Sequence, residues 1–292
     1  MIRTRALPSV LAICIALALN ACGGSIGTAP IPPSVSPPPL PSASNAPQFV
    51  GYWDDWEQTP WSQVPAGVTT LIIAFDFVNG HTVIPDGASP GYVTPSAIAA
   101  LHQRGIKVLI SLGGASPASA FTFDGDTADF ETSLLTVLHQ YGYDGVDFDD
   151  ESGTQAQRTT LLETLIPATR AAFNAYGMVN GIITLAAYDS PDAFGDGAVL
   201  ATPGVATALS WVNVMSYDYT LAETDLQLFA ALYPTTHLML GSDTAGDVPN
   251  PSSATLSTLA SWVKTNTYGG MMVWTLNATT QAQSQAITTA LQ

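Results

Sequence analysis

Hydrophobic residues between Gln48 and Gln292 occur in short apolar runs that alternate with segments of helical periodicity. An almost continuous apolar run of about four to eight residues predicts a strand that is covered on both faces, as in a parallel sheet. Eight such strands are predicted: Phe49–Trp53, Thr70–Phe77, Lys107–Leu112, Gly145–Asp149, Gly181–Ala187, Trp211–Tyr217, His237–Gly241 and Gly270–Trp274.

The segments between these runs predict helices: Thr94–Arg104, Thr127–Tyr141, Thr154–Tyr176, Thr224–Leu232, Ser253–Thr265 and Thr280–Leu291. Pro167 is expected to kink or split the third helix. The crossovers after the first and fifth strands show only weak helical patterns. No glycine-rich phosphate-binding loop follows the first strand, so the alternation predicts a (β/α)8 TIM barrel rather than a doubly wound sheet.

The first 22 residues predict export rather than a folded element. Two arginines precede the apolar run Leu7–Leu19, which is too short for an ordinary membrane span. The run leads to Ala21 and Cys22, a pattern that resembles a bacterial lipobox, in which the cysteine is acylated. We therefore expect residues 1–22 to be a lipoprotein signal peptide, with anchoring through Cys22 in the periplasm or at the cell surface. Asn20 is uncommon at its lipobox position, so secretion without lipid is the alternative.

Residues 23–47 contain eight prolines and no charged residue, a composition that favours polyproline II. We expect a semi-rigid linker that holds the globular part clear of a membrane surface. Residues 48–292 are then expected to form one catalytic domain. Because both cysteines lie within residues 1–22, its stability must come from its core rather than from disulfides.

Charge narrows the range of partners. Without residues 1–22 the chain has five basic and 23 acidic residues, a formal charge of −18. A surface so acidic repels phosphate backbones, so nucleic acid is excluded as an expected partner, and contact with a membrane is expected only through the lipid. We expect a monomer.

The strongest chemical signal is the sequence DGVDFDDE, which begins at Asp144. Side chains alternate along a strand, so Asp147, Asp149 and Glu151 share the face opposite to the valine and the phenylalanine. Three acids at the carboxyl end of a barrel strand predict an active site inside the barrel mouth. A metal site is the competing hypothesis, but the spacing is not that of an EF-hand, and His139 lies before the other end of the strand.

This segment resembles the DxxDxDxE signature of family 18 glycoside hydrolases, the chitinase family. Three further segments match family motifs in the same order along the chain. Ser111–Gly114 is similar to SxGG, Met215–Asp218 is similar to MxYD, and Gly269–Trp274 resembles the closing strand with its tryptophan.

The resemblance implies cleavage of β-1,4-linked N-acetylglucosamine polymers without a cofactor. Glu151 would donate the proton, with a pKa raised by the neighbouring acids, and the acetamido oxygen of the substrate would be the nucleophile, so that configuration is retained. Asp149 would bind the acetamido N–H, Asp147 would share a proton with Asp149, and Tyr217 would donate its hydroxyl to the acetamido oxygen.

Four further residues are expected to contribute to the site. The resemblance implies that Trp274 forms an apolar floor under the sugar and that Ser111 supports Asp147. Asp218 and Tyr52 are expected to contact substrate.

Two features bear on the substrate. An aspartate, Asp150, directly before Glu151 resembles the sequence of the family's endo-β-N-acetylglucosaminidases, which cut N-linked glycans. The sequence MSYDY, in contrast, resembles the chitinase form. Only 17 residues separate Tyr219 from His237, too few for the insertion domain that walls the cleft of processive chitinases. We therefore expect an open groove and endo-type cleavage. An N-glycan endoglycosidase and an inactive chitin-binding lectin are the alternatives.

Overall fold

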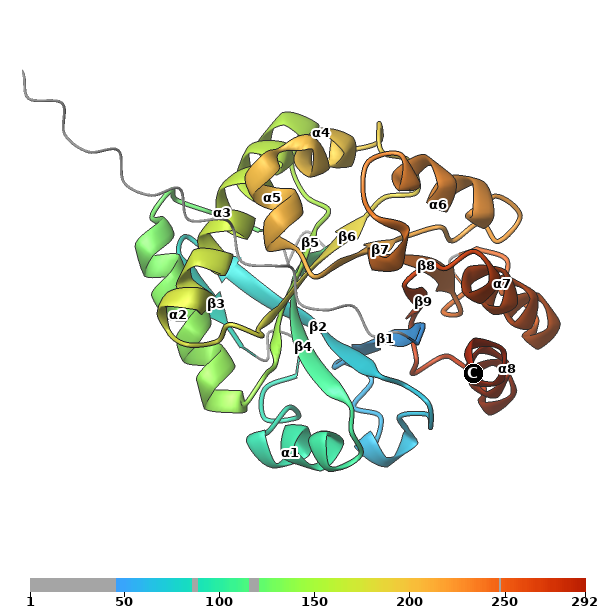
Figure 1. Ribbon diagram of the computed structural model, residues 1–292. Coiled ribbons are helices and arrows are strands. Elements are labelled where there is room, and N and C mark those ends of the chain that lie inside the picture. Colours follow the sequence, from blue (N-terminus) through green and yellow to red (C-terminus); the bar gives the residue numbers. More distant parts are fainter. Residues whose placement is uncertain (1–45, 86–88, 116–120, 247) are drawn as a thin grey trace, which may run out of the picture. The chain divides into compact units, whose positions relative to one another are not determined.

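The computed structural model describes residues 46–85, 89–115, 121–246 and 248–292. Its strands are β1 (Gln48–Asp54), β2 (Thr70–Asn79), β3 (Thr82–Ile84), β4 (Lys107–Gly114), β5 (Gly145–Asp150), β6 (Ile182–Ala187), β7 (Trp211–Val214), β8 (Leu238–Asp243) and β9 (Gly270–Trp274). All except β3 pair in parallel in chain order, and β1 pairs with both β2 and β9. The eight parallel strands therefore close into a ring, which confirms the predicted (β/α)8 barrel (Figure 1).

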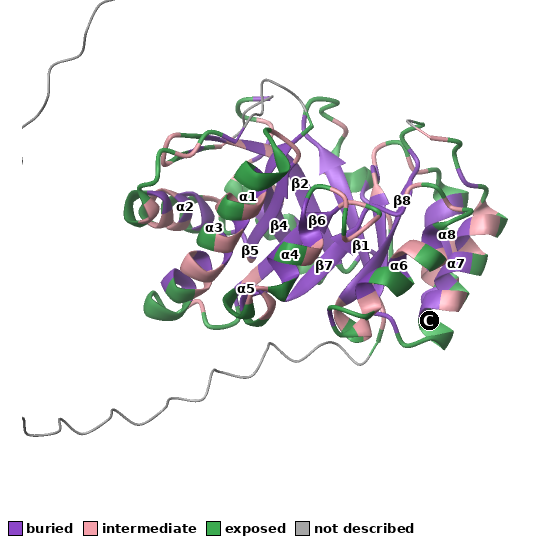
Figure 2. Cartoon of the chain, turned by 90° about the horizontal axis from the view of Figure 1, so that it is seen from above, coloured by how far each residue is buried: buried purple, intermediate pink, exposed green. Residues whose placement is uncertain are grey.

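Helices cover the outer face of the strands, and their exposed sides face away from the barrel (Figure 2). They are α1 (Pro95–Gln103), α2 (Thr127–Tyr141), α3 (Gln155–Ala175), α4 (Asp196–Ala201), α5 (Pro203–Ala208), α6 (Ala222–Ala230), α7 (Ser253–Thr265) and α8 (Gln281–Leu291). All six predicted helices are present, with ends that shift by at most two residues. Within the part of the chain that the structure describes, no helix is both long and apolar enough to cross a membrane.

The two weak crossovers differ from each other. After β1 the chain forms only the 3₁₀ turn η1 (Trp61–Gln63), whereas after β6 it forms the two short helices α4 and α5. Pro167 lies inside α3 and does not split it. Cys22, the predicted signal peptide and nearly all of the predicted linker lie outside the described residues, so those predictions stay predictions.

The apolar side chains form two layers, because residues of a strand alternate between the outside and the inside of the barrel. On β5, Val146 and Phe148 point outward into a large core shared with the helices. A smaller cluster fills the interior and includes Val50, Ile72 and Met272. Asp147 is completely buried in the same interior layer.

Polar residues set where the helices begin. Thr154 and Thr280 form capping boxes with Gln157 and Gln283, so that side-chain oxygens accept the unpaired backbone N–H groups of the first turn. The box at Thr154 lies three residues after Glu151 and fixes the end of the β5–α3 loop.

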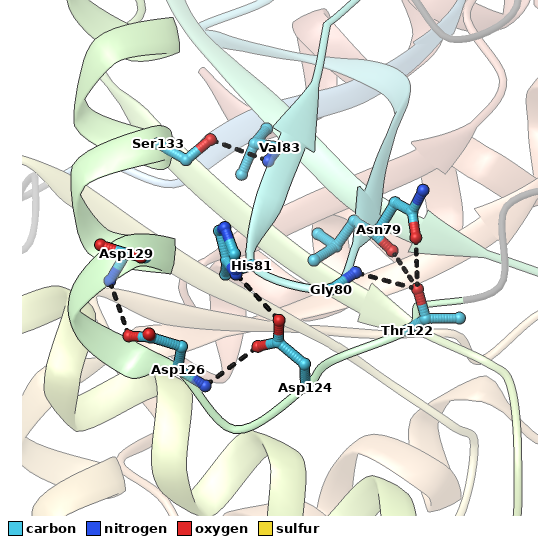
Figure 3. A network of polar contacts seen from close by, with 10 residues as sticks. Asn79, Gly80, His81, Val83, Thr122, Asp124, Asp126, Asp129 and Ser133 are labelled. Carbon is cyan, nitrogen blue, oxygen red and sulfur yellow. Dashed lines mark hydrogen bonds and ion pairs between the residues drawn. The ribbon is translucent and has the colours of Figure 1, made fainter.

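The structure differs most from the prediction at two strands, while the ends of the other strands shift by at most two residues. β7 ends at Val214 rather than at Tyr217, and a short antiparallel strand, β3, adds a hairpin after β2. Figure 3 shows how this hairpin is held against the segment before α2, where Gly80 N donates to Thr122 Oγ1 at 3.2 Å and His81 Nδ1 lies 2.8 Å from Asp124 Oδ2. The hairpin is thereby tied to the start of α2 and to the residues directly before it.

Candidate active site

Asp147 is the buried support of the site. Its carboxylate accepts hydrogen bonds from the hydroxyls of Ser111, at 2.7 Å, and Tyr52, at 2.9 Å, and also from that of Thr184. Asn213 Nδ2 lies at 3.4 Å. Burial raises the pKa of Asp147, and these donors oppose the rise because they stabilise the charged form. The contact predicted between Ser111 and Asp147 is present.

The SxGG segment lets β4 approach β5 closely. A Cβ atom on Gly113 would lie 2.3 Å from the carbonyl oxygen of Asp149, and one on Gly114 would lie 2.7 Å from the ring of Phe75. Both glycines also have positive φ, of 121° and 87°. Only glycine therefore fits at these positions, which hold the backbone of the acid motif in place.

Asp149 and Glu151 open into a cavity of about 290 Å³ at the carboxyl end of the barrel. The described residues that line it are Trp56, Phe75, Ala115, Asp149, Glu151, Met215, Tyr217 and Trp274. Asp149 is buried, and its pKa is raised well above the usual range by burial and by the charges of Glu151 and Asp147. The structure thus brings both acids together with the predicted tyrosine and tryptophan.

The pKa of Glu151 is raised, but for a different main reason than the sequence predicts. Partial burial is the largest cause, and Asp150 adds a smaller repulsion. The hydroxyl of Tyr188 and the charge of Arg158 act in the opposite direction. The mutual repulsion of Asp149 and Glu151 raises the pKa of Asp149 instead. A raised pKa keeps a larger share of Glu151 protonated, as a proton donor requires.

Tyr217 reaches the cavity because β7 ends at Val214, three residues before it. After Met215 N donates to the carbonyl of Ala187, two tight turns follow, in which Ser216 N donates to Val214 O and Tyr217 N donates to Met215 O, each at 2.8 Å. The side chains of Met215 and Tyr217 both line the cavity. Burial and the nearby carboxyls raise the pKa of the Tyr217 hydroxyl well above its usual range, so it remains a hydrogen-bond donor.

Three aromatic rings form one wall of the cavity. The ring of Trp274 lies 5.6 Å from that of Phe75, stacked at 23°, and 6.2 Å from that of Trp56. Trp56 is 44% exposed, so the wall continues from the cavity to the surface. Sequence analysis identified Trp274 but neither Phe75 nor Trp56. A usable signal for Phe75 was an aromatic residue near the carboxyl end of a barrel strand.

Two predicted substrate contacts are not brought to the cavity. Tyr52 is 1% exposed and donates its hydroxyl to Asp147, one layer below the cavity, so it supports the site from beneath. Asp218 lies in an exposed turn, where its Oδ1 accepts hydrogen bonds from the backbone N and the hydroxyl of Thr220. Its carboxylate is therefore engaged in this turn and does not line the cavity.

Asp150 also points away from the acids of the motif. Its Oδ1 accepts hydrogen bonds from the N and Oγ of Ser152, at 3.0 and 2.6 Å, which closes the turn after β5. It borders a second cavity of about 800 Å³, which Phe121, Phe123 and residues of α3 also line. Its side chain therefore shapes the loop that carries Glu151.

Comparisons with known proteins agree with this geometry. The model of the glycosyl hydrolases family 18 matches residues 48–247. A class V chitinase of Arabidopsis thaliana is 25% identical over 181 residues, which are 58% of this chain and 47% of that protein, so the chain spans about half the length of this relative.

Solved structures share the fold. The class V chitinase of Nicotiana tobaccum in complex with NAG4 superposes with a TM-score of 0.68 at 16% identity, over 83% of this chain and 98% of that one. A chitinase of Cycas revoluta in complex with (GlcNAc)3 has a TM-score of 0.66 at 18% identity, over 84% and 98%. The acid motif, the barrel and the family model together show that this chain belongs to family 18 of the glycosyl hydrolases.

Proposed function

We propose that the protein is an endo-acting, retaining glycoside hydrolase that cleaves β-1,4-linked N-acetylglucosamine in chitin oligosaccharides. The observation that carries the proposal is one cavity lined by Glu151, Asp149, Tyr217 and Trp274. Curated relatives named chitinases, and neighbours solved with N-acetylglucosamine oligomers, support the same substrate class.

Glu151 is the proton donor in this proposal. Its carboxyl group stands at the end of β5, is only partly exposed, and has a raised pKa. It protonates the glycosidic oxygen as the bond to the anomeric carbon breaks, and in the second half of the reaction it takes a proton from the attacking water.

Asp149 and Tyr217 act on the acetamido group of the substrate. Burial and two neighbouring charges favour the protonated form of Asp149, whereas Asp147 accepts hydrogen bonds from its surrounding hydroxyls. When the acetamido oxygen attacks the anomeric carbon, Asp149 can pass its proton toward Asp147 and accept the acetamido N–H. The Tyr217 hydroxyl holds the oxygen in line for attack. Because the nucleophile belongs to the substrate, configuration is retained.

Glu151→Gln tests the proposal directly. We expect turnover of chitotetraose to fall by about 10² to 10⁴, because glutamine keeps the shape of the side chain but cannot donate the proton. The matched control is Glu163→Gln, on the outer helix α3, where the side-chain oxygen can still accept from Thr202. Circular dichroism and thermal unfolding check that both variants fold.

The same assay separates the alternatives. Mass spectrometry of products from chitotetraose and from a high-mannose glycoprotein, incubated side by side, identifies the substrate. Release of a glycan that retains one N-acetylglucosamine, with chitotetraose intact, would show an N-glycan endoglycosidase. Binding without any product would show a lectin. Undiminished activity of Glu151→Gln would remove Glu151 from its assigned role.

A further inference from the structure

Tyr188 lies directly after β6 and Glu151 directly after β5, and these neighbouring parallel strands are in register, with Phe148 opposite Leu185. The register places the Tyr188 hydroxyl beside the carboxyl group of Glu151, to which it can donate a hydrogen bond. No sequence motif pointed to this residue. The hydrogen bond favours the charged form of Glu151 and so opposes the rise in pKa that burial causes. Tyr188 therefore contacts the proposed proton donor without lining the cavity itself.

The ring and backbone of Tyr188 are held on three sides. Its ring stacks on Phe194, with centroids 4.0 Å apart and planes 20° from parallel. The guanidinium carbon of Arg158 lies 5.6 Å from the centre of the same ring. The backbone N of Tyr188 donates to Asp196 Oδ2 at 2.8 Å. The hydroxyl thus points to Glu151 from a fixed ring.

Arg158 connects the segment of Glu151 with that of Tyr188. It is 1% exposed and forms an ion pair with Asp196, which is completely buried. Its guanidinium also donates to the carbonyl oxygen of Asp150, next to Glu151, and to that of Ala186 at 3.2 Å, two residues before Tyr188. One buried cation therefore joins the carboxyl ends of β5 and β6.

We propose that Tyr188 is a positioning residue for Glu151, held in place by the buried Arg158–Asp196 ion pair. The inference rests on the function proposed above. In this role the phenol hydroxyl holds the Glu151 carboxyl group in place at the cavity, where the glycosidic oxygen would bind. When Glu151 has given up its proton, the same hydrogen bond stabilises the carboxylate until it accepts a proton from water.

Tyr188→Phe isolates the hydroxyl, since phenylalanine keeps the ring that packs on Phe194 and Arg158. We expect kcat on chitotetraose to fall about tenfold with KM nearly unchanged, the size expected from one hydrogen bond to a charged group. The alkaline limb of the kcat profile should move to higher pH, because Glu151 then keeps its proton longer. The charged or ionisable groups that interact with Glu151 are Asp149, Arg158, Tyr188 and Tyr217, and the charge of Asp150 acts on it from the opposite side of the strand.

The matched control is Tyr233→Phe. The hydroxyl of Tyr233 donates to the carbonyl oxygen of Leu209 at 3.1 Å, before the amino end of β7 and thus away from the cavity. Its loss should lower the melting temperature without moving the pH profile. If Tyr188→Phe behaves like this control, the inference is wrong.

A second measurement does not need turnover. The chain has only five glutamates, so carboxyl-¹³C labelling of glutamate gives few NMR signals, and Glu151→Gln identifies that of Glu151. We expect its titration midpoint to lie about one pH unit higher in Tyr188→Phe than in the wild type. An unchanged midpoint overturns the inference even if the enzyme is active. If the wild type leaves chitotetraose intact, the proposed function fails, and the midpoint still tests the contact.

Discussion

Asp149 is a residue whose proposed role in the reaction conflicts with the stability of the fold. Its carboxyl group is buried beside those of Asp147 and Glu151, and its Oδ1 has no hydrogen-bond partner within the described residues. Charge at this position is therefore costly in the folded state, which is why its pKa is raised. Such a cost is acceptable where the group takes part in the reaction.

Asp149→Asn should therefore stabilise the protein while it reduces activity. A raised folded-state pKa weakens stability as the pH rises from the unfolded value through the folded one, so the variant gains most at neutral pH. We expect the free energy of unfolding in urea to increase by about 1 kcal/mol at pH 7. The gain should shrink as the pH falls and vanish toward about pH 3, below the pKa of the unfolded carboxyl, where it is protonated in both states.

Asp147→Asn serves as the comparison for Asp149→Asn. Asp147 accepts several hydrogen bonds, so its replacement by an amide removes acceptors from buried hydroxyls and should destabilise the fold. If Asp149→Asn also lowers the free energy of unfolding at pH 7, burial of the Asp149 charge does not destabilise the fold.

The sequence alone identifies residues whose chemistry is unusual for their place, and misses those that look like ordinary core. Asp147, Asp149 and Glu151 are three acids on one strand, and no apolar core explains them. Tyr188 follows apolar strand residues and has no such contrast, so only the folded barrel shows that it meets the acids, and for Phe75 the one signal was its place near the end of a strand. The place of Tyr52 beneath the cavity was not predictable for the same reason, because sequence cannot tell which layer of a barrel a side chain occupies.

At the level of elements, the buried ion pair between Arg158 of α3 and Asp196 of α4 joins two helices to two strands. Asp196→Asn removes one charge and leaves a buried guanidinium without its counter-charge. We expect a loss of about 3 kcal/mol in the free energy of unfolding, measured by urea denaturation at pH 7.

An exposed ion pair provides the contrast. His81 and Asp124 lie 2.8 Å apart but are 41% and 46% exposed. Asp124→Asn should hardly change the melting temperature, because water screens this pair. If Asp196→Asn and Asp124→Asn lose equal stability, burial of the Arg158–Asp196 pair does not determine how much that pair stabilises the fold.

Strand and helix cores are predictable here because apolar runs and capping residues are local signals. The ends of the strands and helices are harder to predict. The chain leaves the sheet at Val214 although Met215 and Tyr217 continue the apolar pattern, because the carbonyls at the barrel mouth are satisfied by turns instead of by β8. The strand β3 has only three residues and depends on contacts with the α2 region, which no local pattern reveals.

At the level of the whole molecule, regular alternation of strands and helices was enough to predict the closed barrel, because parallel strands with short crossovers have few other ways to bury both faces. We propose that residues 1–22 direct export and that residues 23–47 tether the barrel to a lipid on Cys22. The described residues begin at residue 46, so they include only the last two residues of this predicted linker.

The short connection between β7 and β8 has a consequence for how a long substrate is cut. Its residues, all described, form only α6 and the 3₁₀ turn η3 (Thr235–His237), so no inserted domain stands in this connection. A polymer could then enter sideways anywhere along its length and leave after one cleavage. The viscosity of a soluble chitin derivative should fall steeply while few reducing ends have appeared, whereas an enzyme that moves along the polymer from one end would release sugars long before the solution thins.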